Sequence, residues 1–192
     1  WTSSANEPMH LGNKALKEMN YISPVESDLA RRYREAGFIV VGRSNTPEFG
    51  LVGTTEPESY GPSRNPWNTD YGTGGSSGGA AAAVASGMVP SANASDGGGS
   101  IRIPAAMCGL VGLKPSRGRV PMGPMQEGWG LSIQHVVCHS MRDAAGILDA
   151  TAIPTMGDGL VAPRYGQPYI DQVGAAPGKL RIGLWNESPR ED

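Results

Sequence analysis

The sequence lacks most features that typify disulfide-rich, membrane-spanning and nucleic-acid-binding proteins. Only two of its 192 residues are cysteine, and they form no C-x-x-C pair, so two free thiols in a reducing compartment are the simplest interpretation. No apolar run approaches the ~18 residues of a membrane-spanning helix. Charged residues make up 18% and the net charge is −2, which disfavours partners such as nucleic acid or an anionic membrane surface. We therefore expect a cytoplasmic protein.

The start of the chain also lacks the usual signals. It begins "WTSSANEPMH", with no initiator methionine, no basic segment and no apolar stretch. A secretory signal peptide is therefore not indicated. Because methionine is missing, we expect that Trp1 is not a natural start.

Glycine, by contrast, is abundant. The chain has 28 glycines and 16 prolines, while 39% of its residues are hydrophobic. The glycines are clustered without the period of collagen, and the apolar runs argue against disorder. A chain of this length suffices for one domain with a buried core.

Helix and strand signals alternate along the chain, which is typical of an α/β domain. Ser23 and Glu26 form a capping box before apolar residues at helical spacing, and Gly37 suits the end of that helix. Residues 38–41 are a continuous apolar run, which predicts a buried strand. The other expected elements are an irregular loop over 56–74, helices over 80–86 and 140–150, a turn or helix over 101–108, and strands over 88–94 and 180–185.

Two glycine-rich segments each adjoin serine. Gly74–Gly79 contains Ser76 and Ser77, and Gly97–Gly99 is followed by Ser100. Neither segment has the phosphate-binding pattern G-x-x-x-x-G-K-[ST] or G-x-G-x-x-G, so nucleotide binding is disfavoured. Three successive glycines present backbone N–H groups without side chains, and such a loop can stabilise an oxyanion while a neighbouring serine attacks. A serine also needs a proton acceptor, and a second serine can begin such a relay.

Two interpretations based on histidine remain open. The sequence GGSSG matches the nucleophile elbow G-x-S-x-G, so a Ser-His-Asp esterase built on Ser76 or Ser77 with His135 or His139 is an alternative, although the preceding residues are polar. His135 and His139 also have the spacing of zinc ligands, but the glutamate of H-E-x-x-H is missing. Structural or surface histidines are favoured over a metal site.

The serine-bearing region resembles the amidase signature family of serine amidohydrolases. The resemblance lies in "GTGGSSGGAAAAVASGMVP" and "SDGGGSIRIPAAMCGLVGLKPSRGRVP", and it extends upstream through "SDLARRYREAGFIVVGRSNTPEFG" and "TTEPESYGPSRNPWN". It spans residues 27–121 and continues more weakly through "HSMRDAAGILDA". It implies an α/β fold in which helices cover both faces of a mixed, twisted β-sheet. It also implies a hydrolase of linear or cyclic amides that needs no metal or organic cofactor.

The resemblance assigns roles to individual residues. It implies a triad of serine, cis-configured serine and lysine, with Ser100 as the nucleophile and Ser76 as the bridging serine. The implied oxyanion hole is built from backbone N–H groups at Gly97, Gly98, Gly99 and Ser100. Supporting roles are implied for Ser77, Asp96 and Arg102.

The third member of the triad has no counterpart in this sequence. The family's lysine lies in an L-K-D-like element ahead of the matched region, and Lys14, Lys17 and Lys114 stand in other contexts. We therefore expect residues 1–192 to be a single partial domain without the lysine-bearing segment and the C-terminal part, inactive by itself. The expected partner is a small-molecule amide, and a homodimer is allowed for. A catalytically inactive fragment or homologue with a binding or assembly role is the second alternative.

Overall fold

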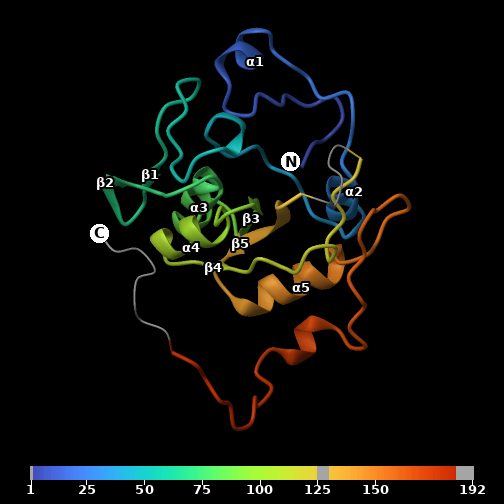
Figure 1. Cartoon of the computed structure of the whole chain (residues 1–192). Coiled ribbons are helices and arrows are strands. Elements are labelled where there is room, and N and C mark those ends of the chain that lie inside the picture. Colours follow the sequence, from blue (N-terminus) through green and yellow to red (C-terminus); the bar gives the residue numbers. More distant parts are fainter. Residues whose placement is uncertain (1, 125–129, 185–192) are drawn as a thin grey trace.

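The computed structural model describes residues 2–124 and 130–184, and its centre is a three-stranded antiparallel sheet (Figure 1). The strand order is β3 (Ser91–Asp96), β5 (Ile133–Cys138) and β4 (Val111–Gly112). The register pairs Ser91 with Cys138 and Asp96 with Ile133. Every residue of β5 is buried, as expected for a central strand covered on both faces.

Helices cover both faces of this sheet, in agreement with the expected α/β architecture. Alternate residues of a strand point to opposite faces, and β5 supplies Val136 and Cys138 to one core cluster and Val137 to another. The first cluster includes side chains of α2 (Asp28–Glu35) and α5 (Met141–Thr151). The second includes side chains of α3 (Gly78–Ala85) and α4 (Arg102–Cys108).

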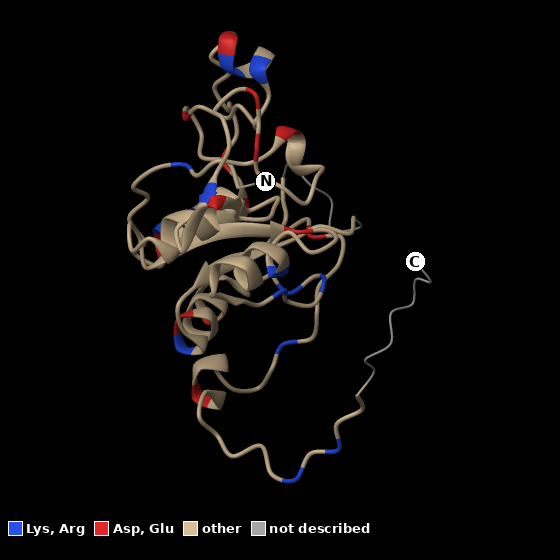
Figure 2. Ribbon diagram, turned by 90° about the vertical axis from the view of Figure 1, so that its left-hand side faces the viewer, with Lys and Arg blue, Asp and Glu red and all other residues tan. Residues whose placement is uncertain are grey.

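The remaining elements lie outside these layers. They are α1 (Lys14–Glu18), the 3-10 helices η1 (Glu48–Gly50) and η2 (Tyr169–Gln172), and a hairpin of β1 (Arg64–Asn65) and β2 (Asn68–Gly72). In the ribbon of Figure 2 the positions of charged residues are few along the stacked sheet and helices and lie mainly at the periphery. Both cysteines are free and buried. None of the described helices is long and apolar enough to cross a membrane.

Several expected elements are confirmed and others are wrong. Helices α3, α4 and α5 and strand β3 lie within a few residues of the predicted ranges. The irregular loop over 56–74 is wrong in part, because it contains the β1–β2 hairpin. Its turn uses the Asn65 side chain, whose Oδ1 accepts a hydrogen bond from the Trp67 N–H at 3.0 Å.

The helix predicted to start at Ser23 begins later. Ser27 is the N-cap of α2, and its hydroxyl accepts from the Ala30 N–H at 3.2 Å. A tertiary contact favours Ser27 as the N-cap. Its hydroxyl and its backbone N–H both donate hydrogen bonds to the Ser3 carbonyl oxygen. Gly37 does follow the helix with a positive φ of 86°.

The buried strand predicted over 38–41 and the strand predicted over 180–185 are both wrong, because residues 38–41 and 180–184 are exposed and unpaired within the described residues. The exposed fractions of Phe38, Ile39, Val40 and Val41 are 37%, 87%, 68% and 76%. Residues 180–184 form no strand, and Trp185 lies outside the described residues. A strand needs a partner for its backbone groups, and none of the described segments provides one here.

Candidate active site

The segment after β3 is organised by one buried carboxylate, that of Asp96. Its side chain is fully buried and accepts hydrogen bonds from the N–H groups of Gly99 at 2.8 Å and Ile101 at 3.2 Å. It also accepts from the Arg102 N–H at 3.4 Å and from Arg102 Nε and Nη2, each at 2.9 Å. Burial by itself raises the pKa of Asp96, but the bonds from Arg102 and from the backbone amides outweigh it and lower the pKa. The carboxylate is therefore ionised at neutral pH and fixes the loop that leads into α4.

This arrangement separates the three glycines of the segment into two groups. The Gly99 N–H is bonded to Asp96, whereas the N–H groups of Gly97, Gly98 and Ser100 make no hydrogen bond within the described structure. Gly97 and Gly98 are also exposed. Gly99 has a φ of 138°, and a Cβ there would lie 2.7 Å from Ile103 Cδ1. Gly99 therefore shapes the loop, and the other three N–H groups have no hydrogen-bond partner in the part of the chain that the structure describes.

The first glycine segment lies beside the second. The Ser77 N–H donates to the Ser100 carbonyl at 3.2 Å. The Ser77 hydroxyl accepts from the Ser95 N–H at 3.1 Å and lies 3.3 Å from the Ser95 carbonyl, to which it can donate. Ser77 therefore ties the first segment to the end of β3. Ser76 is 3% exposed, and the peptide bond between Gly75 and Ser76 is cis.

Sequence reasoning missed two threonines that contact the first glycine segment. The Thr55 hydroxyl donates to the Gly74 carbonyl at 2.9 Å and lies 3.4 Å from the Ser76 carbonyl. The Thr46 hydroxyl reaches the same Ser76 carbonyl at 3.4 Å. Thr55 lies in the quoted segment TTEPESYGPSRNPWN, so the resemblance contained the signal, but nothing local connects it with residues about twenty positions later.

Neither histidine ring is hydrogen-bonded to the hydroxyl of Ser76, Ser77 or Ser100 in the described structure. His135 is fully buried, neither ring nitrogen makes a hydrogen bond in the described structure, and burial lowers its pKa to about 4. His139 is exposed, and its Nε2 lies 2.9 Å from the Val84 carbonyl. No cluster of three or more His, Cys, Asp or Glu side chains occurs among the described residues. The geometry offers no support for a histidine-based esterase or for a zinc site.

The lysines considered from the sequence are also engaged elsewhere. Lys14 forms an ion pair with Glu58 at 2.6 Å, Lys17 donates to the Ser59 carbonyl, and Lys114 donates to the Pro115 carbonyl at 2.7 Å. None of these bonds involves Ser76 or Ser100.

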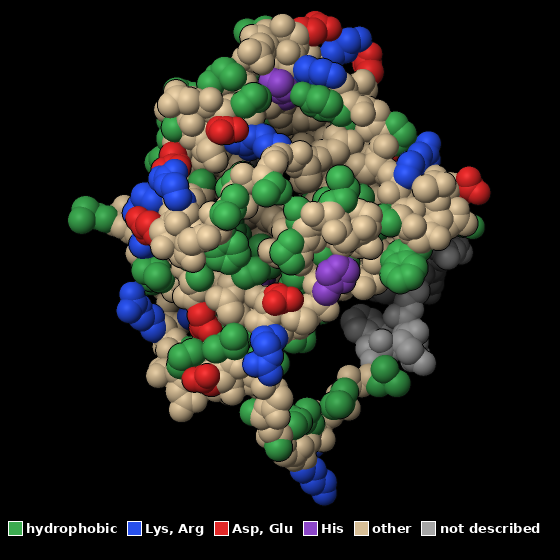
Figure 3. All heavy atoms as spheres, turned by 180° about the vertical axis from the view of Figure 1, so that it is seen from behind, with side chains coloured by type: hydrophobic (Ala, Val, Ile, Leu, Met, Phe, Trp, Pro, Cys, Tyr) green, Lys and Arg blue, Asp and Glu red, His purple; other side chains and the backbone are tan. Residues whose placement is uncertain are grey.

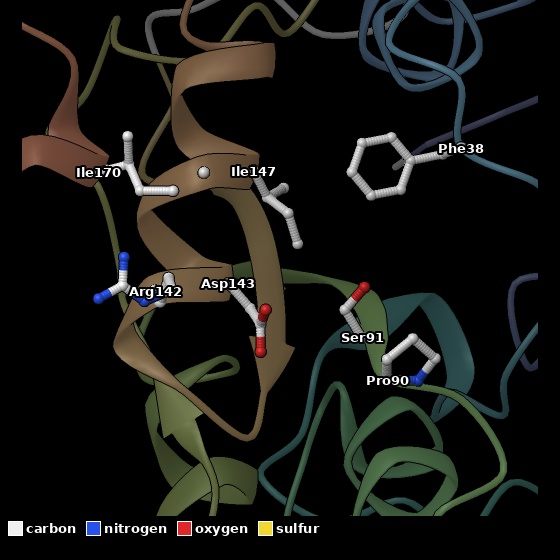
Figure 4. A pocket seen from close by; sticks show the side chains of 8 residues that line it. Phe38, Pro90, Ser91, Arg142, Asp143, Ile147 and Ile170 are labelled. Atoms are coloured by element: carbon white, nitrogen blue, oxygen red, sulfur yellow. The ribbon is translucent and has the colours of Figure 1, made fainter. Parts of the chain in front are cut away.

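One hollow among the described residues lies outside the two glycine segments. It has a volume of about 440 Å³ and contains no residue of either glycine segment. Figure 4 shows Phe38 facing Ile147 of α5 across the hollow, with Ser91 at the start of β3 below them. Its lining is mainly apolar.

Comparison with known proteins identifies the family. The sequence model of the family described as Amidase matches residues 5–192. The chain belongs to the Amidase family. It is 42% identical to the 6-aminohexanoate-cyclic-dimer hydrolase of Paenarthrobacter ureafaciens over 183 residues, which are 93% of this chain and 37% of that amidase. A putative amidase of Synechocystis sp. is also 42% identical, over 93% of this chain and 35% of its own length. The chain thus spans little more than a third of these relatives.

Solved amidase structures confirm the fold. The structure of 6-aminohexanoate cyclic dimer hydrolase complexed with substrate matches with a TM-score of 0.91 and 40% identity, over 95% of this chain and 39% of that one. A bacterial aryl acylamidase of the amidase signature family matches with a TM-score of 0.82 and 34% identity, over 90% and 36% of the two chains. The resemblance to amidase signature enzymes is therefore confirmed.

Proposed function

We propose that the protein containing this chain hydrolyses amide bonds through an acyl-enzyme on Ser100. The observation that carries the proposal is the loop fixed by Asp96. Among the described residues, this loop leaves the N–H groups of Gly97, Gly98 and Ser100 without hydrogen-bond partners. Family membership supports amide hydrolysis as the reaction class.

In the proposed mechanism, a neutral lysine supplied by another part of the protein takes the proton of the Ser76 hydroxyl. Ser76 takes the proton of Ser100, and Ser100 Oγ attacks the amide carbonyl carbon. The oxyanion accepts hydrogen bonds from the three unpaired amides, and loss of one such donor costs roughly 3–4 kcal/mol in comparable enzymes. The C–N bond then breaks, the amine leaves with the relayed proton, and water hydrolyses the ester to release the acid.

The three residues given supporting roles from the sequence keep those roles in this proposal, and one of the residues assigned to the oxyanion hole is reassigned. Ser77 and Asp96 position the two loops, and Arg102 is the ion-pair partner of Asp96 at 2.9 Å. Gly99, initially grouped with the oxyanion donors, is assigned to the loop geometry because its N–H is already bonded to Asp96.

The proposed substrates are small linear or cyclic amides. The support is the 42% identity to 6-aminohexanoate-cyclic-dimer hydrolases from two sources and the fold shared with an aryl acylamidase. A panel that contains a cyclic amide dimer, an aryl acylamide and a primary amide, assayed with the full-length gene product, tests the substrate class. A preference for simple carboxylic esters with no hydrolysis of any amide contradicts it.

The mechanism is tested by Ser100→Ala in the full-length protein. We expect amide hydrolysis to fall by about a thousandfold or more and labelling by a fluorophosphonate probe to disappear. His139→Ala is the control and should retain both. If Ser100→Ala retains labelling while His139→Ala loses it, Ser100 is not the nucleophile and the esterase alternative gains support.

A further inference from the structure

A single buried hydroxyl, that of Thr55, contacts three residues of the first glycine segment. It donates to the Gly74 carbonyl at 2.9 Å, lies 3.4 Å from the Ser76 carbonyl, and accepts from the Gly78 N–H at 3.1 Å. We propose that Thr55 is a positioning residue that holds Ser76 in place for proton transfer. This inference rests on the proposed function, in which Ser76 relays the proton of Ser100.

The hydroxyl is needed because the site is closed to water. Thr55 is 1% exposed, so a buried carbonyl or N–H that loses this partner has no solvent to replace it. One hydroxyl has a single proton to donate and two lone pairs that accept. Thr55 uses it both as a donor and as an acceptor, and both partners lie in the first glycine segment. The Ser76 carbonyl has a second donor in Thr46, also at 3.4 Å.

The packing around Thr55 limits how the segment can relax. A Cβ on Gly78 would lie 2.4 Å from Thr55 Oγ1, and one on Gly75 would lie 2.4 Å from the Thr54 carbonyl oxygen. Residues 54–55 therefore press directly against the backbone on both sides of Ser76. When the hydroxyl is replaced by a methyl group, this close packing leaves the loop no room to move closer to Thr55.

The consequence for the reaction is a change in the Ser76 position rather than in substrate binding. A relay hydroxyl must lie within hydrogen-bond reach of both its proton donor and its acceptor, and a displacement of about 1 Å costs on the order of a hundredfold in rate. Thr55 contacts neither serine hydroxyl in the described structure. Its effect should therefore appear in kcat and in the labelling rate of Ser100, with KM little changed.

The test compares Thr55→Val, Thr55→Ser and the control Thr151→Val in the full-length protein. Thr151 is also fully buried, and its hydroxyl donates to the Ile147 carbonyl within α5 at 2.7 Å, far along the chain from the serines. We expect Thr55→Val to lower kcat and fluorophosphonate labelling by roughly 10- to 100-fold with KM within about twofold. Thr55→Ser should restore most of the loss, and Thr151→Val should keep wild-type rates.

The outcomes separate the inference from the function on which it rests. Absence of labelling and hydrolysis in the wild-type protein overturns the proposed function. Wild-type activity that is lost in Ser100→Ala but kept in Thr55→Val overturns only the role of Thr55. If Thr55→Val does not fold, Thr46→Val takes its place, because it removes the second donor to the Ser76 carbonyl from a less buried position. If Thr46→Val keeps the wild-type kcat and Thr55→Ser, which retains the hydroxyl, has a low kcat, the inference is also overturned.

Discussion

At the scale of single residues, the carboxylate of Asp96 concentrates more hydrogen bonds than any other side chain near the serines. Five N–H bonds from Gly99, Ile101 and Arg102 converge on it. Asp96→Asn keeps the size of the side chain but removes its charge and turns one acceptor into a donor. Hydrogen bonds to a charged group contribute about 1.5–3 kcal/mol, so we expect labelling of Ser100 to fall roughly 10- to 100-fold. Asp143→Asn, an exposed change at the start of α5, is the control for this kinetic measurement. Equal labelling rates in the two variants would exclude a role for Asp96 in placing the loop.

His135 provides a residue-scale prediction about pH. Its folded-state pKa is about 4, because burial disfavours the charged ring, whereas an unfolded histidine titrates near ~6.5. Between these values the unfolded state binds more protons, so stability is fully present above pH ~6.5 and is lost as the pH falls toward 4. The expected loss is about 2 kcal/mol at pH 5. Urea unfolding at pH 7.5 and pH 5 measures it. His135→Leu should reduce this pH dependence, and His139→Ala should leave it in place.

At the scale of elements, α3 depends on a glycine at its second position. A Cβ on Gly79 would lie 2.3 Å from the Asn45 nitrogen and 2.4 Å from its carbonyl oxygen, and backbone atoms cannot turn aside as a flexible side chain can. Gly79→Ala is therefore expected to destabilise the protein by about 1–3 kcal/mol, although alanine is the better helix former. Gly53→Ala is the matched control, since no atom lies within 4 Å of its Cβ position. Thermal unfolding of both variants checks this, and a Gly79→Ala protein as stable as Gly53→Ala would contradict the packing argument.

The elements that sequence reasoning predicted well are those whose signals are local. Ser140 caps α5 through the Asp143 N–H at 3.0 Å, as its sequence pattern indicates. The predicted start of α2 was wrong because Ser23 and Ser27 are both suitable N-caps, and only Ser27 is hydrogen-bonded to the Ser3 carbonyl. The two glycine segments stood out in the sequence, and the structure places them side by side. Thr55 was missed because its contacts with residues 74–78 arise only when the chain folds.

At the scale of the whole molecule, the exposed apolar run Phe38–Val41 is the largest departure from expectation. Figure 3 shows hydrophobic side chains spread over one face of the molecule. Ile39, Val40 and Val41 are each more than two-thirds exposed. Continuous exposed apolar segments are characteristic of interaction sites and of aggregation. The cytoplasmic location and the homodimer stay predictions. The exposed apolar run is a surface through which a homodimer could form.

The same run yields a prediction about the 192-residue chain expressed alone. We expect it to self-associate and to bind a hydrophobic dye, because burying apolar surface contributes about 25 cal/mol per Å². Ile39 and Val41 lie two positions apart and share one side of an extended segment, so the double variant Ile39→Asp/Val41→Asp should lower both signals in light scattering and dye titration. Met88→Asp, an equally exposed position at 77% outside the run, is the control. In the full-length protein the double variant should instead lower the melting temperature if further residues cover this side. A double variant that leaves self-association unchanged would show that the run is not the surface responsible.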